Sequence, residues 1–324
     1  MTTFKELRGT AIQSLSSDPS NPEAGQIWYN SSSGTLKGYA LTNVYAWASG
    51  GTLSVGMRNA ALFGTQTAAL NAGGINSTGI IGTTQSYNGT SWSSLPATLN
   101  TPRESVNGAG TQTAGIIIGG LDPAISSAVE SWNGSSWTNI TSLPAARDYG
   151  GAVGTQTATL YFGGRTPPTT GTSFSYDGAA WTSGGTMNTA RFGFGYAGNS
   201  NTAALAFGGQ PPPTGVSATE SYNGTSWTSL NNLNTARADL GGLGTQTLAL
   251  GFGGSGPGTS TELWNGTSWT SNPTGLGSGR LQLKGCGTQT AGLTAGGFTG
   301  PATPTSFSEE WTGQALQTKT ITVS

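Results

Sequence analysis

A repeat of about 44 residues restricts the fold of this chain more than any other feature. The motif Gly-Thr-Gln-Thr occurs five times, and a degenerate copy, Gly-Asn-Ser-Asn-Thr, fills the one gap in the series. The six copies begin at Gly64, Gly110, Gly154, Gly198, Gly244 and Gly287. Such a period indicates repeated supersecondary units that bury a shared core between neighbours.

Each copy contains four short segments that predict β-strands. In the clearest copy they fall within residues 237–243, 245–254, 261–264 and 267–271. The second segment is apolar throughout, as in residues 114–118, which is typical of a strand buried on both faces. The last two segments are joined by Asn-Gly or Asp-Gly between aromatic residues, a strong hairpin signal because the turn needs a positive φ.

Four antiparallel strands in each of six repeats predict an all-β, six-bladed β-propeller, and a seven-bladed ring is the alternative. The composition agrees, because 54 glycines and only 8% charged residues favour turns and strands over long helices. A Gly-Gly pair ends the second strand of every copy, where a tight exit would exclude a side chain.

These Gly-Gly pairs, each followed by two spaced aromatic residues, resemble the kelch repeat over residues 52–316. The resemblance implies a kelch-like propeller. In this chain the two aromatics stand five residues apart, closer than in most kelch repeats, which implies a shorter outer hairpin. An additional aromatic pair, Tyr39 and Trp47, precedes the first repeat, so we expect residues 36–50 to lie against the last blade as a closing clasp within a propeller domain of residues 36–324.

Residues 1–35 differ in composition from the repeats and form a separate N-terminal segment. Residues 26–30 and 35–39 predict a hairpin around Ser-Ser-Ser-Gly. The run Gly-Gln-Ile-Trp-Tyr-Asn resembles the N-terminal segment of tail-fibre and appendage proteins of tailed bacteriophages, and the Gly- and Thr-rich repeats are similar to proteins of marine phages. The resemblance implies docking to other virion proteins through residues 1–35. The alternative is a strand pair that only packs on the propeller.

Charge and residue usage exclude several functions. The net charge is −1, so the chain has no basic field to bind nucleic acid. The absence of histidine removes the usual general base and the imidazole ligands of metal sites, so we expect neither catalysis nor a cofactor. No apolar run is long enough to insert into a membrane. The single cysteine, Cys286, is interpreted as a small core residue.

Arginine and glutamate recur at fixed places in the repeats. One arginine stands six or seven residues before each Gly-Thr-Gln-Thr copy, and a glutamate often stands two residues before the first aromatic. The residues are Arg58, Arg103, Arg147, Arg191, Arg237, Arg280, Glu130, Glu220, Glu262 and Glu309. We interpret them as structural bonds that lock the blades. The alternative is a ring of positive charge that takes an anionic ligand such as an acidic glycan.

The loops after the Gly-Gly pairs vary most and are rich in Pro, Gly and Thr. Because they occupy the same place in every blade, we expect them to gather on one rim as a recognition surface, unless they are only connectors. The candidate binding residues in these loops are Leu121, Asp122, Arg165, Pro167, Gln210, Pro212 and Phe298.

The function we expect is that of a non-enzymatic phage virion protein, a tail appendage or head decoration on the particle surface. Its rim loops would contact polysaccharide on the host surface, with weak contacts multiplied by copy number. The alternative is a free carbohydrate-binding or protein-interaction propeller of a cell, and enzymatic activity is a third class.

Overall fold

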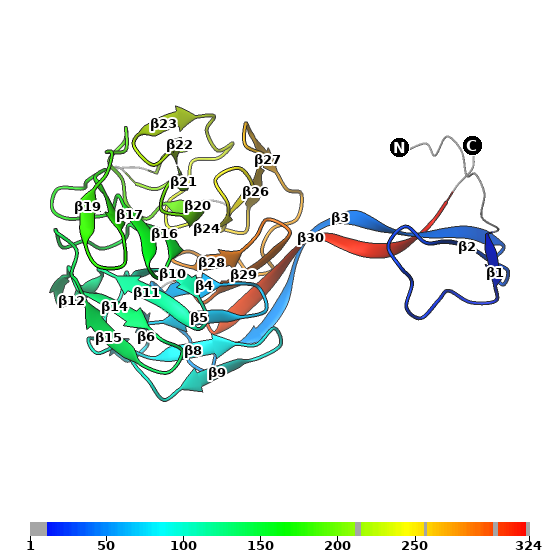
Figure 1. Cartoon of the computed structure of the whole chain (residues 1–324), viewed down its shortest axis with the longest axis horizontal. Helices are drawn as coiled ribbons and strands as arrows, with labels where there is room; N and C mark the ends of the chain where they lie inside the picture. The colour runs from blue at the N-terminus through cyan, green and yellow to red at the C-terminus, as the bar shows by residue number, and fades with distance from the viewer. Residues whose placement is uncertain (1–11, 211–214, 256–257, 301–303, 322–324) are drawn as a thin grey trace. The chain divides into compact units, whose positions relative to one another are not determined.

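The computed structural model describes residues 12–210, 215–255, 258–300 and 304–321. The chain divides into two compact units, one of Met1–Tyr45 with Gly313–Ser324 and one of Ala46–Thr312 (Figure 1). The first unit therefore extends beyond residue 35, where the sequence analysis places its boundary, and takes in the C-terminal segment. The regular secondary structure of the described residues consists of β-strands. These residues include no helix that could cross a membrane.

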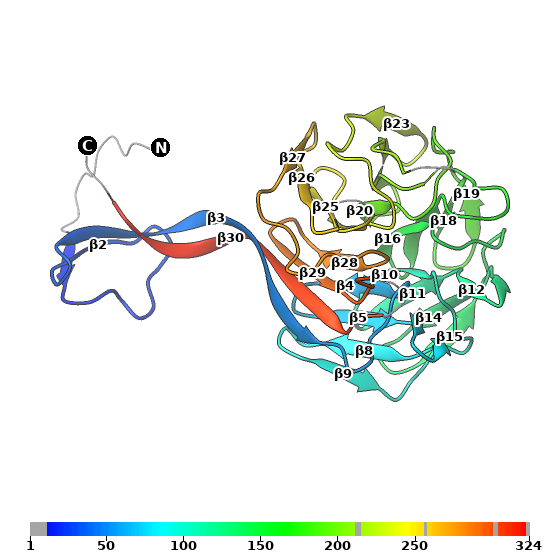
Figure 2. The ribbon, with the colours of Figure 1, turned by 180° about the vertical axis from the view of Figure 1, so that it is seen from behind.

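The second unit contains five sheets of four antiparallel strands, each in chain order (Figures 1 and 2). The first is β4 (Ala61–Gly64), β5 (Ala69–Ala72), β8 (Thr84–Tyr87) and β9 (Trp92–Leu95). The second is β10 (Asn107–Thr111), β11 (Ala114–Ile118), β14 (Val129–Trp132) and β15 (Trp137–Ile140). The third is β16 (Gly151–Thr155), β17 (Ala158–Phe162), β18 (Ser173–Tyr176) and β19 (Trp181–Ser183). The fourth is β20 (Gly195–Ser200), β21 (Ala203–Phe207), β22 (Thr219–Tyr222) and β23 (Trp227–Leu230). The fifth is β24 (Gly241–Gly244), β25 (Ala249–Phe252), β26 (Thr261–Trp264) and β27 (Trp269–Ser271).

The last repeat forms a sheet that combines strands from the N-terminal and C-terminal parts of the chain. Its strands are β28 (Lys284–Gly287), β29 (Ala291–Ala295), β30 (Phe307–Thr320) and, beside β30, β3 (Thr35–Thr52). Two further hairpins follow Gly-Gly pairs, β6 (Ile75–Asn76) with β7 (Gly79–Ile80) and β12 (Leu121–Asp122) with β13 (Ala124–Ile125).

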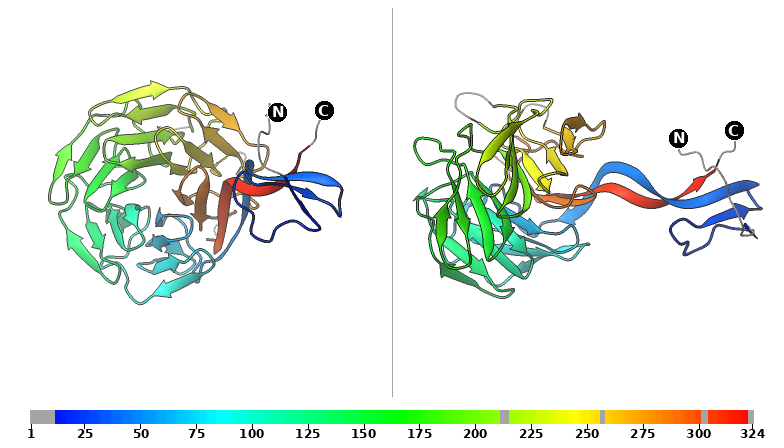
Figure 3. Two further views of the ribbon diagram at one scale, coloured as in Figure 1. Left: turned by 45° about the vertical axis from the view of Figure 1, so that its right-hand side comes forward. Right: turned by 45° about the horizontal axis from the view of Figure 1, so that its top comes forward.

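The sheets of the second unit surround one axis, as a β-propeller requires (Figure 3). The first strand of each repeat contacts the first strand of the next, from β4 through β10, β16, β20, β24 and β28, and β28 contacts β4 again. Apolar side chains fill the spaces between successive sheets. One such cluster joins Leu62 and Tyr87 of the first sheet to Leu293 of the last, and it also contains the buried Cys286.

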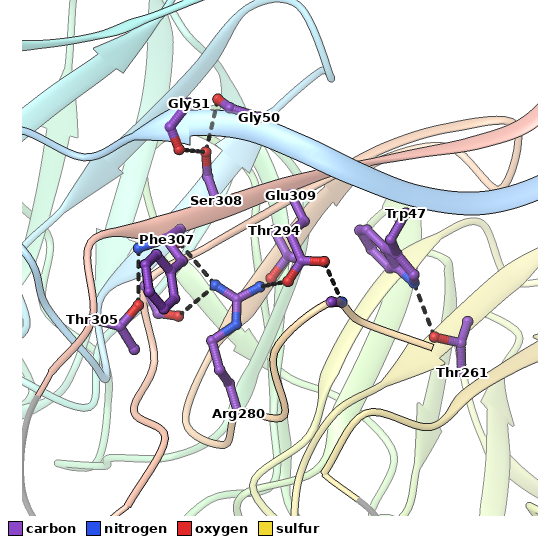
Figure 4. A network of polar contacts seen from close by, with 12 residues as sticks. Trp47, Gly50, Gly51, Thr261, Arg280, Thr294, Thr305, Phe307, Ser308 and Glu309 are labelled. Carbon is purple, nitrogen blue, oxygen red and sulfur yellow. Dashed lines mark hydrogen bonds and ion pairs between the residues drawn. The ribbon is translucent and has the colours of Figure 1, made fainter. Parts of the chain in front are cut away.

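The N-terminal part of this unit supplies the outer aromatic residue of the last sheet. In most repeats the second aromatic donates a hydrogen bond from Nε1 to a Ser or Thr hydroxyl of the preceding sheet, as Trp137 does to Thr84 over 2.9 Å. Trp47 of β3 does the same to Thr261 over 2.9 Å (Figure 4). The centroid of its ring lies 5.4 Å from that of Trp311. The aromatic pair of this sheet is therefore Trp311 with Trp47, and the expected pairing of Trp47 with Tyr39 is wrong.

Residues 46–52 of β3 are held in place by backbone and hydroxyl groups. Ser308 Oγ lies 2.8 Å from the carbonyl oxygen of Gly50 and 2.9 Å from that of Gly51 (Figure 4). The amide of Leu53 donates to the carbonyl of Ser306 over 2.8 Å. Of the segment expected to act as a clasp, residues 46–50 lie in this sheet and residues 36–45 belong to the first unit.

The first unit contains the predicted hairpin. Strand β2 (Ile27–Asn30) pairs antiparallel with the start of β3, and β1 (Gln13–Leu15) pairs parallel with β2. Trp28 is fully buried, and its Nε1 donates to Asp18 Oδ1 over 3.0 Å. The side-chain Nδ2 of Asn30 donates to the same oxygen over 2.7 Å, so one carboxylate connects the loop to the hairpin.

Candidate functional site: the axial face

Most charged residues of the propeller are part of its framework. Arg237, which is fully buried, donates from Nη1 to the backbone carbonyls of Gly253 and Ser260 and from Nη2 to Glu262 Oε1 over 2.8 Å. Glu262 accepts the amide of Asn234 on its other oxygen. A desolvated guanidinium needs such acceptors, and those of Arg237 serve Nη1 and Nη2, whereas its Nε has none among the described residues. The pair with Glu262 defines the path of the chain into the sheet.

Three other repeats contain the same ion pair. Arg103 lies 3.0 Å from Glu130, Arg191 lies 3.2 Å from Glu220, and Arg280 lies 2.6 Å from Glu309 (Figure 4). Each pair joins the start of one sheet to the third strand of the same sheet, so it stabilises a blade internally. The arginines are buried, so they do not form a positive ring open to a ligand.

Two repeats depart from this pattern. Arg147 faces Phe174, whose ring centroid lies 4.7 Å from its guanidinium carbon, and it donates to the carbonyl of Thr172. In the first repeat the place of the arginine is taken by Met57, because the carbonyl of Met57 accepts the amide of Gly297 just as the carbonyl of Arg280 accepts that of Gly254. The assignment of Arg58 to the blade-locking set is therefore wrong by one residue.

The Gln of Gly-Thr-Gln-Thr joins one sheet to the next. Gln112 Nε2 donates to the carbonyls of Ala69 and Tyr87 in the preceding sheet, and Gln66 Nε2 donates to those of Gly292 and Trp311 in the last sheet. Equivalent bonds are made by Gln156, Gln246 and Gln289. The motif thus satisfies backbone acceptors between blades, a role that the sequence analysis did not assign.

The remaining charged residues of Ala46–Thr312 gather at one end of the axis. Two acids have local roles elsewhere, since Asp177 accepts two amides of its hairpin turn and Glu310 accepts the hydroxyl of Tyr87. The other charged residues are Arg58, Glu104, Asp122, Asp148, Arg165, Asp239 and Lys284. All seven lie next to the start of the first strand of a repeat or in the loops that follow the Gly-Gly pairs.

A ring of six residues marks this end, and we call it the axial ring. Its members are Asn59, Ser105, Tyr149, Gly193, Asp239 and Gln282, one from each repeat, and all six have φ between 52° and 60°. The amide of each of five members donates to the carbonyl of the preceding member over 2.6–3.2 Å. Left-handed conformations cost about 1–2 kcal/mol for residues other than Gly. Such strain in five side-chain-bearing residues is typical of a functional site.

A second layer surrounds the axial ring, and we call the two layers together the axial face. The residue before each of five ring members forms a β-bridge with the residue after a Gly-Gly pair, as in Arg58 with Ile75 and Asp148 with Arg165. At the sixth position the amide of Ser255 donates to the carbonyl of Ala238. Equivalent bridges place Leu121, Gln210 and Phe298 beside Glu104, Phe192 and Leu281. Four predicted binding residues therefore hold one equivalent position around the axis.

The other predicted binding residues lie farther out or cannot be placed. Asp122 follows Leu121 in β12 and is exposed, and Pro167 is exposed in the loop after Arg165. Pro212 lies outside the described residues. Sequence reasoning missed the axial ring itself, although the positions after the framework arginine differ in every repeat and carry charges.

Side chains on the axial face are extensively bonded. Arg165 Nε and Nη2 donate to the two carboxylate oxygens of buried Asp148 over 3.1 and 2.6 Å. The guanidinium carbon of Arg165 lies 5.2 Å from the ring centroid of Tyr149 and 5.8 Å from that of Phe192. Asn59 Nδ2 donates to Glu104 Oε2 over 3.0 Å and to the hydroxyl of Tyr149 over 2.9 Å.

Burial perturbs the acids and the lysine of this face. It raises the pKa of Asp148 and of Asp239, and the neighbouring cations Arg165 and Lys284, respectively, oppose the rise. Burial also lowers the pKa of Lys284 to about 8, against the opposing effect of Asp239. Perturbed ionisation in a concave site is associated with function.

The two ends of the axis differ in character. At the axial ring a cavity of about 10 Å³ has room for one water molecule. At the opposite end the first strands of all six repeats line a cavity of about 190 Å³. Its described lining consists of Gly, Ala, Val, Leu, Phe, Cys and neutral polar residues, without a charged group. Among the described residues, no three acidic or cysteine side chains cluster as a metal site would require.

Comparison with known proteins supports the fold alone. No protein-family model and no curated protein matches the sequence. Among solved structures 499 chains match, and one of them is described as "Structure of YjhT". That chain superposes with a TM-score of 0.69 and 14% identity, covering 82% of this chain and 99% of its own. The chain therefore has a β-propeller fold, which supports both binding proteins and enzymes.

Proposed function

We propose that this chain is a non-enzymatic surface protein of a tailed-phage virion, whose six-bladed propeller contacts host glycans through the axial face. One observation carries the binding role. The charges that the framework does not use gather at one end of the propeller axis, among strained and bonded side chains. The framework positions keep the same residue types in most repeats, whereas the ring positions differ in every repeat.

The blade count in this proposal rests on the repeats. Six first strands contact one another in a closed order, and Trp47 completes the aromatic pair of the last sheet. A seventh blade would need another first strand between β28 and β4, which contact each other directly. The two-stranded hairpins β6–β7 and β12–β13 are decorations of the rim in this interpretation.

The first unit supplies the attachment to the particle. It contains both ends of the chain and a hairpin whose loop is held by the carboxylate of Asp18. We therefore assign to it the contact with other virion proteins that the Gly-Gln-Ile-Trp-Tyr-Asn run implies. The head surface and the tail appendage are both compatible with this arrangement.

Gold-labelled antibody against the propeller, applied to purified particles, tests the virion role. Label on tail fibres or tail tip supports host attachment, and label over the head supports decoration. Absence of label on intact particles, under conditions in which the antibody detects the purified chain, contradicts the proposal. A chain without residues 1–34 keeps residues 46–52 of β3, so it should retain a folded propeller and fail to assemble onto particles.

The second candidate is a free carbohydrate-binding or protein-interaction propeller of a cell. It is favoured by the position of the axial face, which is complete within Ala46–Thr312 and needs no residue of the first unit. Under this alternative, deletion of residues 1–34 changes neither location nor binding, so the same variant separates the two functions.

A further inference from the structure

We infer that the axial face binds an uncharged, hydroxyl-rich ligand, the end of a neutral saccharide, and discriminates against acidic glycans. The inference rests on the glycan contact in the proposed function and names the class of glycan. It follows from which charged groups of the face are already bonded and which remain open.

The two arginines of the face, Arg165 and Arg58, already contact neighbouring residues. Arg165 has a two-point ion pair with Asp148 and lies over two aromatic rings, so its charge is already neutralised. Arg58 donates from Nη1 to Gln282 Oε1 over 2.5 Å, and its guanidinium carbon lies 5.0 Å from the ring centroid of Phe298. The Nε of Arg58 has no hydrogen-bond partner among the described residues, and the charge of Arg58 acts on Asp239. An anionic ligand would therefore have to displace the contacts of Arg165 or compete with the carboxylate of Asp239 for Arg58.

The third cation, Lys284, lies beneath the axial ring and interacts with Asp239. Lys284 is two residues beyond Gln282 on β28, where it lines the cavity under the axial ring and approaches the ring of Tyr196 to 5.2 Å. Its positive charge faces Asp239, which opposes the lowering of its pKa. Lys284 therefore acts as the counter-charge of Asp239 and does not present an ammonium group to an acidic ligand.

The acceptors of the face, in contrast, are open. The carboxylate of Asp239 makes no hydrogen bond to another described residue, and Oε1 of Glu104 is likewise open in that part of the chain, since only Oε2 accepts from Asn59. A Cβ at Gly193 would lie 2.6 Å from Asp239 Oδ1, so glycine at this ring position leaves space for the carboxylate. The two layers contain three acids, Glu104, Asp148 and Asp239, and two arginines, with Lys284 beneath the ring. Open acceptors on such a face favour a ligand that donates hydrogen bonds.

A buried hydroxyl adds to this set. Ser105 is 3% exposed and lines the cavity under the ring, where it interacts with the hydroxyl of Tyr149, but its Oγ makes no hydrogen bond of good geometry to a described residue. The cavity is too small to enclose a sugar, so the ligand must lie on the ring and reach these groups by its hydroxyls or through one water. The five backbone hydrogen bonds between successive ring members hold the ring before binding, which lowers the entropy cost.

A glycan array with neutral, amino and acidic saccharides tests the inference, using the full chain. Asp239→Asn removes the open charge, and Asn59 shows that asparagine is accepted at this ring position with a φ of 55°. Asp177→Asn is the matched control, because four other repeats have asparagine in that turn. A hydrogen bond to a charged group contributes about 1.5–3 kcal/mol, so we expect neutral-glycan affinity to fall about 10- to 100-fold in Asp239→Asn.

The control should bind within about twofold of the wild-type chain, since its charge lies away from the face. Preferential binding of acidic glycans, or neutral-glycan binding that Asp239→Asn leaves unchanged, would overturn the inference while leaving a glycan contact in place. If the wild-type chain binds no glycan at all, the inference and the glycan contact both fail. Gold label on particles would then still support the virion role, so the failures are distinguishable.

Discussion

The ion pair of Arg237 and Glu262 has an uncharged counterpart in the first repeat, and this counterpart suggests a matched substitution. In the first repeat Met57 and Gln85 stand at the equivalent positions, and both are buried. Gln85 donates to the carbonyl of Val55 and accepts its amide, as Glu262 accepts the amide of Asn234. The double variant Arg237→Met with Glu262→Gln therefore introduces the uncharged residue pair that already occupies these positions in the first repeat.

The single variant Arg237→Met leaves the carboxylate of Glu262 buried without its cation. Removing one partner of a buried pair costs about 3–5 kcal/mol of unfolding free energy, whereas replacing both with a matched pair is often nearly neutral. The two carbonyls that lose Arg237 add about 1 kcal/mol to the double variant. We therefore expect losses of about 3–5 kcal/mol for the single variant and about 1–2 kcal/mol for the double variant.

Equilibrium unfolding in denaturant, followed by tryptophan fluorescence, measures both values. At about 2 °C per kcal/mol for a domain of this size, thermal midpoints should fall by about 6–10 °C in the single variant and recover in the double variant. A double variant as unstable as the single one would refute the reasoning. It would mean that the bonds of Arg237 to backbone carbonyls, and not the buried charge, dominate.

Three further predictions concern the closure of the propeller by Trp47, the hydrogen bonds of Gln246 between sheets, and the charge of Lys284. Trp47→Ala should lower the unfolding free energy by about 3 kcal/mol and lower the thermal midpoint, because the last sheet loses its outer aromatic residue; an unchanged midpoint would contradict the assigned closure. Gln246→Ala should cost about 1–2 kcal/mol in denaturant titrations, since two backbone carbonyls of the fourth sheet lose their donor, while the same change at Asn201, which bonds one hydroxyl, should cost less. Wild type should gain stability relative to Lys284→Met as the pH rises from 8 to 10.5, because burial holds the pKa of Lys284 at about 8 in the folded chain, below its ordinary value. At pH 7 the variant escapes the cost of a buried ammonium group but loses the counter-charge of Asp239, so the test is the change in the stability difference with pH, and a constant difference from pH 8 to pH 10.5 would contradict the assignment.

Local patterns in the sequence predict much of the repeat. The Asn-Gly and Asp-Gly turns, the apolar second strands and the double glycines each specify local geometry, and the strands lie where these patterns place them. Pairing of Arg with Glu was also visible, because both recur at fixed spacing in a chain with few charges.

Local sequence patterns did not predict the contacts between segments that are distant in the chain. The shift from Arg58 to Met57 appears only when the backbone bond to Gly297 is known, and the partner of Trp47 proved to be Trp311, far along the chain. The division at Tyr45 likewise depends on which segments pack together.

The sequence by itself determined the strand content, the period and the turns, since these depend on residues close together in the chain. Only the tertiary structure decided that six variable positions meet in one strained ring, and that the unused charges surround it. Closing the ring brings together residues from all six repeats, and their proximity depends on the geometry of the whole propeller rather than on any local preference.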